Sequence, residues 1–351
     1  MTQTPRIVFI AGAGPAVGGG HVMRCLTLAD ALAAAGAACA FAATPGAAAV
    51  LDAFAGPGIA RLPVAEGVVA AGSVAALAAR AADAARAWGA DAAVIDHYGF
   101  GPQDEAVVAA AVSRTLAIDD LRRPHGCDLV LDSNLGRTAA DYPGVAALTG
   151  TGFALVRPAF AALREAALAR RRGAAKVERI LVSLGLTDVG GITARVVEAL
   201  APVRGDAALD VVVGGGAASL PALRALAEAQ GGIALHVDTP AMAALTAAAD
   251  LAIGAGGSSV WERCCLGLPT VTLVLADNQR PNALALAKAG AAVVVEARGD
   301  GFAGRLQGAA AGLIASPKAR RALGGAGAGL CDGLGAERVA DRVLSLVGQA
   351  R

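Results

Sequence analysis

Residues 6–26 read RIVFIAGAGPAVGGGHVMRCL, and this stretch decides the fold. A six-residue apolar run leads into a glycine-rich turn, and apolar residues then recur at helical spacing from Val22 to Ala35. A buried strand, a glycine turn and a helix in this order are typical of a doubly wound α/β domain. Further apolar runs and an alanine-rich helix follow: strands at 37–43, 92–96, 115–120 and 128–132, and the helix at 75–88. We therefore predict a parallel sheet that is covered by helices on both faces.

The same pattern restarts after residue 160. A basic helical segment at 160–172 ends in Arg170–Gly173, which we interpret as a connector with a solvated charged face rather than a phosphate site. Apolar strands are then expected at 179–183, 210–213, 233–237, 251–253, 270–275 and 292–295. The fold class predicted is α/β, with two doubly wound parallel-sheet domains at 1–160 and 161–351 that face a cleft. We expect the tail, 299–351, to add helices over the second domain.

Composition excludes several classes of protein. The 351 residues carry 30 Lys and Arg against 29 Asp and Glu, so bulk charge does not favour nucleic acid or anionic lipid as a partner. Hydrophobic residues reach 56%, but much of this is alanine, and the longest uncharged run, 31–51, is interrupted by glycine and proline, so no membrane span is predicted. The N-terminus lacks the features of a signal peptide. Six cysteines without CxxC spacing favour reduced thiols in the cytoplasm. We expect a monomer or weak homodimer.

The first glycine turn is a weak match to a dinucleotide-binding fingerprint. Its spacing is GxGxxxG, Pro15 stiffens it, and the second strand ends at Thr44-Pro45 without the carboxylate that would bind a ribose. A nicotinamide enzyme is therefore disfavoured, and no cofactor is expected.

His21 is the candidate catalytic residue. It follows three glycines at a predicted helix start, where the helix dipole disfavours imidazolium, and a neutral imidazole on an exposed turn can accept a proton near neutral pH. The alternative is a helix-capping or surface histidine. Gly19 and Gly20 would give a ligand access to the backbone, and Arg24 is expected on the same helix face.

Polar residues end three successive strands of the first domain. They are Asp96-His97-Tyr98, Asp119-Asp120 and Asp132-Ser133-Asn134. One such group is usually a turn or helix cap, but three at one sheet edge predict the lining of a cleft that binds a hydroxyl- and amide-rich ligand. Zinc binding through His97, His125 and Cys127 lacks metal-site spacing, and no metal is predicted.

A second glycine turn lies in the second domain. Gly256, Gly257, Ser258 and Ser259 lead into a helix and are suited to hold phosphate oxygens, and Glu262 one turn later could accept hydrogen bonds from ribose hydroxyls. The alternative is a serine N-cap with a glutamate that complements the helix dipole. Two neighbouring loops are expected to complete this site: Ser183, Leu184, Gly185, Thr187 and Asp188 in one, and Asn278, Gln279 and Asn282 in the other.

Together these motifs resemble known families. The second-domain runs GAGGSSVWERCCLGLP (254–269) and DNQRPNALALAKAGAA (277–292) resemble the nucleotide-sugar half of the enzyme that transfers N-acetylglucosamine in lipid II synthesis. Six other motifs resemble the UDP-2,4-diacetamido-2,4,6-trideoxy-β-L-altropyranose hydrolases of pseudaminic acid biosynthesis. They are GGGHVMRCLTLA (18–29), VIDHYG (94–99), AIDDL (117–121), HGCDLVLDSN (125–134), GFALVRPAF (152–160) and SLGLTD (183–188). The resemblance covers most of residues 7–296.

The resemblance to these hydrolases implies a GT-B-like fold and metal-independent release of UDP. It implies that His21 activates a water, which attacks the anomeric carbon with inversion and C–O cleavage. It also implies that His97, Tyr98, Asn134 and Asn282 surround the sugar, and that Glu262 holds the ribose. Arg157 is expected to contact phosphate or sugar. Two departures are the uncharged stretch at 11–16 and Leu186, where the family has a glycine.

Two other functions stay open. One is a GT-B glycosyltransferase that delivers the sugar of a UDP-amino-sugar donor to an acceptor hydroxyl. The other is a non-catalytic sugar-nucleotide-binding regulator of flagellin glycosylation. The presence of both a candidate base and a phosphate turn favours the hydrolase.

Overall fold

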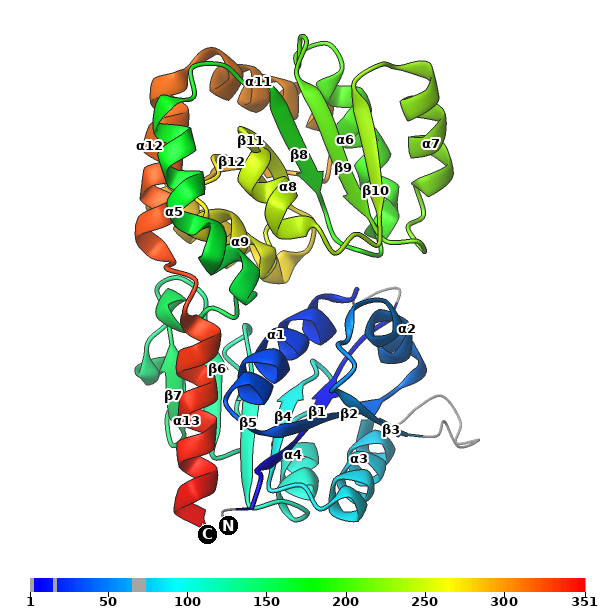
Figure 1. Cartoon of the computed structure of the whole chain (residues 1–351), viewed down its shortest axis with the longest axis vertical. Helices are drawn as coiled ribbons and strands as arrows, with labels where there is room; N and C mark the ends of the chain where they lie inside the picture. Colours follow the sequence, from blue (N-terminus) through cyan, green and yellow to red (C-terminus); the bar gives the residue numbers. More distant parts are fainter. Residues whose placement is uncertain (1–2, 15–17, 65–73, 351) are drawn as a thin grey trace. The chain divides into compact units, whose positions relative to one another are not determined.

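The computed structural model describes residues 3–14, 18–64 and 74–350, and the chain divides into two compact units. The first comprises Met1–Leu155 together with Leu334–Arg351, and the second comprises Val156–Gly333. Each unit has a parallel sheet with helices on both faces (Figure 1). The predicted fold class, two parallel-sheet α/β domains, is therefore confirmed.

The first unit is built on a seven-stranded sheet in the order β3-β2-β1-β4-β5-β6-β7. Its strands are β1 (Arg6–Ala11), β2 (Ala38–Ala43), β3 (Ala60–Pro63), β4 (Ala92–Asp96), β5 (Arg114–Ile118), β6 (Leu129–Asp132) and β7 (Ala146–Thr149). Its helices are α1 (Gly20–Ala34), α2 (Pro45–Phe54), α3 (Val74–Trp88), α4 (Pro102–Ala109) and α13 (Gly335–Ala350), with 3-10 turns η1 (Ala139–Asp141) and η2 (Thr151–Phe153). Because every strand pair is parallel, all carboxyl ends lie at one edge.

Alternation along β1 divides the core of this unit between the two faces. Ile7 and Phe9 pack with buried residues of α1, α2 and α13, whereas Val8 and Ile10 pack with alanines of α3 and with Val108 of α4. Successive strand residues point to opposite faces, so an apolar residue at every position fits a strand that is covered on both sides. The buried face of α3 is made of the alanines Ala78, Ala81 and Ala85, which belong to the same core cluster as Val8 and Ile10.

The second unit has a six-stranded sheet in the order β10-β9-β8-β11-β12-β13. Its strands are β8 (Arg179–Ser183), β9 (Ala208–Val213), β10 (Ile233–Val237), β11 (Leu251–Ala255), β12 (Thr270–Val274) and β13 (Val293–Glu296). Its helices are α5 (Pro158–Gly173), α6 (Ile192–Leu200), α7 (Leu220–Ala229), α8 (Met242–Ala248), α9 (Ser259–Cys265), α10 (Arg280–Lys288), α11 (Phe302–Ala315) and α12 (Pro317–Leu330), with 3-10 turns η3 (Val189–Gly191) and η4 (Asp277–Gln279). Residues of α6 and α11 share one hydrophobic core with β8 and β11.

The C-terminal helix differs from the expectation for the tail. Helices α11 and α12 belong to the second unit, as expected, but α13 packs against α1, η2 and β5 of the first unit (Figure 1). Val339, Ala340, Val343 and Val347, spaced three and four residues apart, form its buried stripe. The expected second domain, 161–351, therefore runs too far, because a helix's apolar stripe does not say which sheet it covers.

The basic segment at the end of α5 differs from the expected solvated face, because its arginines bind other parts of the second unit. The Arg171 guanidinium is buried and donates to Leu266 O, to Thr246 O at 2.6 Å and to Ala249 O at 3.1 Å. These carbonyls lie near the C-terminal ends of α8 and α9, where backbone acceptors lack helical partners. Arg170 adds an ion pair to Asp250 at 2.6 Å.

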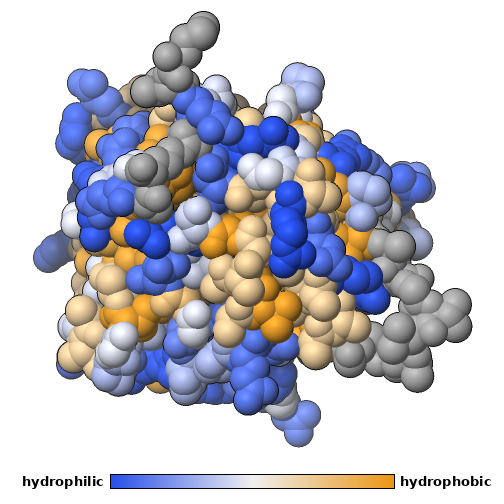
Figure 2. All heavy atoms as spheres, turned by 90° about the horizontal axis from the view of Figure 1, so that it is seen from below, coloured by the Kyte–Doolittle hydropathy of each residue, from blue (hydrophilic) through white to orange (hydrophobic). Residues whose placement is uncertain are grey.

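The lengths and hydropathy of the helices bear on the question of a membrane span. Among the described residues, no helix combines the length and apolar character that crossing a bilayer requires. On the face seen in Figure 2, hydrophobic residues are interspersed with hydrophilic ones.

Candidate active site

The candidate active site of the first unit lies at the carboxyl edge of its sheet. The turn after β1 leads to His21 and Arg24 on α1, β4 ends at Asp96, which is followed by His97 and Tyr98, and Asp120 follows β5. The register aligns Ala11 of β1 with Asp96 of β4, so the two strands end side by side. Parallel topology therefore brings three distant segments to one place.

Asp96 and His21 are the centre of this site. His21 Nδ1 lies 2.5 Å from Asp96 Oδ1, and Asp96 is fully buried. A carboxylate oxygen can only accept, so Nδ1 carries the proton, and in the neutral ring Nε2 then presents its lone pair. Among the described residues Nε2 has no hydrogen-bond partner. The ring is therefore held in the tautomer that a general base requires.

Arg24 holds the same carboxylate. Its Nε lies 2.5 Å from Asp96 Oδ2, and its Nη2 lies 2.7 Å from Asp96 Oδ1. Burial alone would raise the pKa of Asp96, but the charge and hydrogen bonds of Arg24, together with the hydrogen bond of His21, outweigh burial and hold that pKa well below its usual value. Asp96 is thus an anion with two partners.

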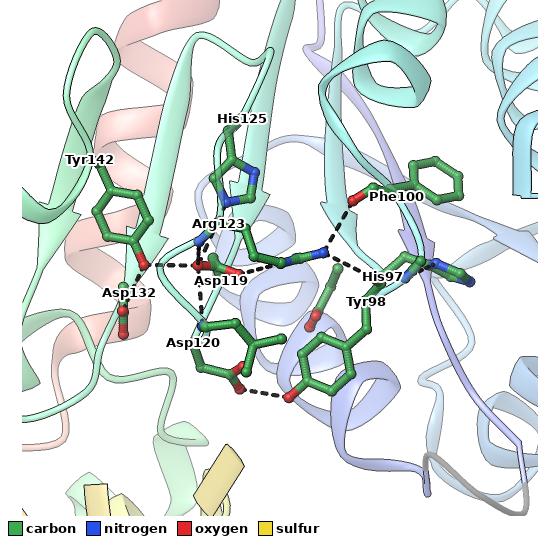
Figure 3. A network of polar contacts seen from close by, with 12 residues as sticks. His97, Tyr98, Phe100, Asp119, Asp120, Arg123, His125, Asp132 and Tyr142 are labelled. Carbon is green, nitrogen blue, oxygen red and sulfur yellow. Dashed lines mark hydrogen bonds and ion pairs between the residues drawn. The ribbon is translucent and has the colours of Figure 1, made fainter. Parts of the chain in front are cut away.

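Tyr98 and Asp120 close the other side of the His21 ring. The Tyr98 ring meets the imidazole edge-on, with centroids 4.4 Å apart. Its hydroxyl donates to Asp120 Oδ2 at 2.9 Å (Figure 3). Arg24 Nη1 reaches the same oxygen at 3.2 Å. Asp120 therefore fixes both neighbours of His21.

His97 turns away from this cluster. Its Nδ1 accepts from Gly99 N at 3.1 Å, and its ring packs on Phe100 and against Gly12, where an added Cβ would lie 3.1 Å from His97 Cδ2. Burial lowers the pKa of His97. His97 is therefore a neutral side chain at neutral pH, which fits a hydrogen-bonding rather than an ionic role.

A second polar network lies beside the site (Figure 3). The Tyr142 hydroxyl is 2.9 Å from Asp119 Oδ2 and 2.7 Å from Asp132 Oδ2. Arg123 binds Asp119 through its Nε at 2.9 Å and donates through its Nη1 to Tyr98 O at 2.8 Å. This network joins the ends of β5 and β6 to the Tyr98 loop, and so it supports the segment that carries the candidate site.

His125 completes the second network. Its Nδ1 lies 2.8 Å from Glu105 Oε1, and its Nε2 lies 3.6 Å from Asp119 Oδ2. Burial would lower the pKa of His125, but Asp119 and Glu105 outweigh burial and raise it to about 9. A buried imidazolium between two carboxylates is a structural ion pair.

The residues that the structure brings together differ from the three that were considered as zinc ligands. Glu105, His125 and Cys127 offer ligand atoms within 4.8 Å of one another, and His97 is not among them. Burial raises the pKa of the Cys127 thiol to about 12, and its Sγ donates to Leu129 O. A protonated thiol and an imidazole already bound to carboxylates favour a hydrogen-bonded cluster over a metal centre.

The second glycine turn has the predicted local structure. Gly256, Gly257 and Ser258 join β11 to α9, and Ser259 is the first residue of that helix. An added Cβ at Gly256 would lie 3.2 Å from Gln279 Cβ, which places η4 against the turn. Gln279 Oε1 accepts from Leu275 N at 3.1 Å. Within the second unit, the turn and the predicted amide loop therefore lie together.

Glu262 and Arg157 form an ion pair, with Arg157 Nε 2.7 Å from Glu262 Oε1. Arg157 precedes α5 and lies over the Phe160 ring. The pair fixes the carboxylate for which a ribose contact was predicted.

The loop after β8 differs from its expected role at two positions. Asp188 is fully buried and accepts from Thr193 N at 2.9 Å, Thr193 Oγ1 at 2.6 Å, Ser219 N at 3.2 Å and Ser219 Oγ. Its carboxylate ties this loop to α6 and to the start of α7, and Leu184 is buried in the core. Ser183 and Thr187 are half-buried, and Gly185 is exposed with φ +111°.

The remaining predicted positions are distributed between the units. Gly19 is the N-cap of α1 and Gly20 its first residue, with nothing within 4 Å of a Cβ added at Gly20. Asn134 follows β6 and its backbone N–H donates to Asp132 Oδ1 at 2.9 Å. Asn278 lies in η4 and Asn282 is buried in α10. Pro15, part of the predicted stiff turn, lies outside the described residues.

Two residues of the site are absent from the set predicted to act. Asp96 and Asp120 were noted only as polar strand ends, although Asp96 directly precedes the predicted position His97. For Asp96, the sequence did contain a signal, because an aspartate stands at the end of an otherwise apolar, buried strand. In addition, His21 is 6% exposed rather than on an exposed turn, because Tyr98 and Arg24 enclose its ring.

Comparisons with known proteins find one matching family model and two curated relatives. The C-terminal domain of glycosyltransferase family 28 matches residues 233–299. UDP-2,4-diacetamido-2,4,6-trideoxy-beta-L-altropyranose hydrolase of Campylobacter jejuni is 26% identical over 203 residues, which is 56% of this chain and 71% of that protein. The resemblance predicted from the motifs is confirmed. Spore coat polysaccharide biosynthesis protein SpsG of Bacillus subtilis is 31% identical over 146 residues, 41% of this chain and 42% of that protein.

Solved structures confirm the GT-B fold. MurG of Acinetobacter baumannii superposes with a TM-score of 0.62 at 19% identity, covering 98% of this chain and 99% of that one. The spinosyn rhamnosyltransferase SpnG, solved with thymidine diphosphate, gives a TM-score of 0.64 at 18% identity over 97% of this chain and 100% of that chain. At these identities the likeness shows the fold alone.

Proposed function

We propose that this protein is a hydrolase that releases UDP from a UDP-linked diacetamido-trideoxy sugar, UDP-2,4-diacetamido-2,4,6-trideoxy-β-L-altropyranose, in pseudaminic acid biosynthesis. The observation that carries the proposal is the His21–Asp96 pair, which leaves Nε2 as the ring's acceptor. The likeness to the Campylobacter hydrolase supports the choice of substrate.

In the proposed reaction, His21 Nε2 takes a proton from a water whose oxygen attacks the anomeric carbon. The bond between that carbon and the diphosphate oxygen breaks, its electron pair leaves with UDP, and the configuration inverts. Asp96 stabilises the imidazolium that forms. UDP is a good leaving group, so a positioned base, worth about 10²–10⁴-fold, is sufficient without a metal.

Binding of the substrate is assigned to both units. His97, Tyr98 and Asn134 are proposed to contact the sugar. In the second unit, the 256–259 turn is proposed to hold the diphosphate and Glu262 the ribose. The ion pair of Glu262 with Arg157 supports this assignment, because it holds the carboxylate in one orientation.

Incubation with the purified UDP-sugar tests the proposal. UDP and free sugar should appear at equal rates with and without a chelator such as EDTA. In H₂¹⁸O the label should enter the sugar and not UDP. His21→Asn should abolish release, whereas His236→Asn, which removes a histidine paired with Asp210 in the second unit, should retain it. Label in UDP, or full activity of His21→Asn, would exclude this mechanism.

A glycosyltransferase is the second candidate, and the family 28 domain match favours it. It shares the donor but requires an acceptor hydroxyl in place of water. UDP release that depends on an added acceptor, with no release in its absence, would select this function.

A further inference from the structure

Arg24 was predicted to bind substrate, yet its guanidinium is already engaged. Three of its nitrogens bind carboxylates: Nε and Nη2 hold Asp96, and Nη1 reaches Asp120. Its side chain is 13% exposed. Because all three nitrogens of this guanidinium already donate to carboxylates, few N–H groups are left to bind a ligand.

Arg24 and His21 share one oxygen of Asp96. Nδ1 of His21 lies 2.5 Å from Asp96 Oδ1, Nη2 of Arg24 lies 2.7 Å from the same atom, and Nη2 lies 3.2 Å from Nδ1. A buried anion alone beside the ring would favour imidazolium, whereas a cation at the same distance opposes it. The charge of Arg24 therefore decides how strongly Asp96 can draw a proton onto the ring.

Within the described part of the chain, the other charged or titratable groups around the ring come from three segments. On α1 these are Arg24 and Cys25, after β4 they are His97 and Tyr98, and after β5 it is Asp120. Burial raises the pKa of Cys25 well above its usual value, so this thiol stays neutral. Asp120 binds Tyr98 and Arg24 rather than His21. Arg24 is thus the cation in direct contact with both members of the pair.

We propose that Arg24 is a positioning residue that cancels the charge of Asp96, so that His21 remains unprotonated and keeps Nε2 as a proton acceptor near neutral pH. This inference rests on the proposed function only in naming His21 as the base. Asp96 then supplies the orientation of the ring, and Arg24 sets its charge.

The test compares Arg24→Met, which removes the charge at similar length, with Arg24→Lys, which keeps it. Protonation of His21 is followed by ¹⁵N NMR of the imidazoles, which is tractable because the chain has four histidines and His21→Asn assigns the signal. In Arg24→Met the pH at which half of the His21 imidazole is protonated, its titration midpoint, should rise by about one pH unit or more. In Arg24→Lys it should move by less than half as much. The acidic limb of the kcat/KM profile should move in parallel.

Arg24→Met leaves a buried anion with one partner fewer, so a companion variant guards against a loss of folding. Arg24→Met/Asp96→Asn removes both charges, and its His21 midpoint should fall below that of Arg24→Met. Unmoved midpoints in an active protein would overturn the Arg24 inference alone. A parent protein without UDP release, in which the midpoints nevertheless shift as stated, would overturn the proposed function and leave the role of Arg24 supported.

Discussion

Asp96 Oδ1 lies 2.5 Å from His21 Nδ1, and the two residues are 75 positions apart in the chain. The contact exists because β1 and β4 are neighbours in the sheet although five other helices and strands separate them in the sequence. The pair is an orienting carboxylate and a base, an arrangement that recurs on unrelated folds.

Asp96→Asn should therefore reduce kcat while KM for the UDP-sugar changes little. An amide in place of the carboxylate no longer fixes the tautomer that leaves Nε2 free, and we expect a loss of about 10²–10⁴-fold. Steady-state kinetics measure it. Asp91→Asn is the matched control, since Asp91 precedes the same strand and accepts from Arg6 N at 2.8 Å. Equal losses in both variants would show that Asp96 only stabilises the strand.

The pH dependence of stability should depend on His125. Its pKa is about 9 in the folded protein and about 6.5 when unfolded, so the folded state binds the proton more tightly. Stability from this group is fully present below pH 6.5 and is lost as pH rises through 9. The difference between the folded and unfolded pKa limits the contribution of His125 to the free energy of unfolding to about 3 kcal/mol.

Urea unfolding between pH 6 and 9.5 measures this effect. His125→Gln should lower stability at pH 6 and remove most of the decline towards pH 9. His236→Gln, which removes a partly exposed histidine, should leave the decline in place. If stability still declines to the same extent in His125→Gln, the pH dependence arises from another titratable group.

Much of the fold could be predicted from the sequence because its strands are continuous apolar runs. Strands β1, β4, β8 and β10 have the predicted bounds. Strand β3 was missed because its sequence, Ala-Arg-Leu-Pro, is short and partly exposed at the sheet edge. Edge strands lack the apolar pattern by which buried strands are recognised.

The candidate site could be predicted only in part. His21 and the strand-end residues were found because glycine turns and polar strand ends are local patterns. The partners of a side chain are not local. Arg24 and Asp188 carry charges that suit a ligand, but both are bound by other residues of the chain. That distinction depends on which strands are neighbours.

Two glycines with opposite surroundings allow a test of the role proposed for the first turn. A Cβ at Gly20 meets nothing within 4 Å, whereas one at Gly254 would lie 2.4 Å from Arg263 Cζ in the core of the second unit. Gly20→Ala should leave stability unchanged or raise it by up to about 1 kcal/mol, since alanine favours a helix. If the turn accommodates the sugar, KM should rise nonetheless.

Gly254→Ala should instead destabilise the protein by about 1–3 kcal/mol, because the guanidinium must move. Thermal unfolding and steady-state kinetics on both variants separate the two effects. An unaltered KM in Gly20→Ala would remove Gly20 from the proposed substrate contacts.

Glu262 should make nucleotide binding depend on the ribose hydroxyls. If its carboxylate accepts hydrogen bonds from the ribose hydroxyls, the protein should bind UDP more tightly than 2′-deoxy-UDP, and Glu262→Gln should lose about tenfold in affinity for UDP together with most of that preference. Arg157→Met should give a smaller loss, because it frees the carboxylate from its 2.7 Å contact without removing it. Glu165→Gln, an exposed position on α5, is the matched control. Calorimetric titration measures all four proteins. A preference that survives in Glu262→Gln would leave the Arg157–Glu262 pair a structural contact between α9 and the segment before α5.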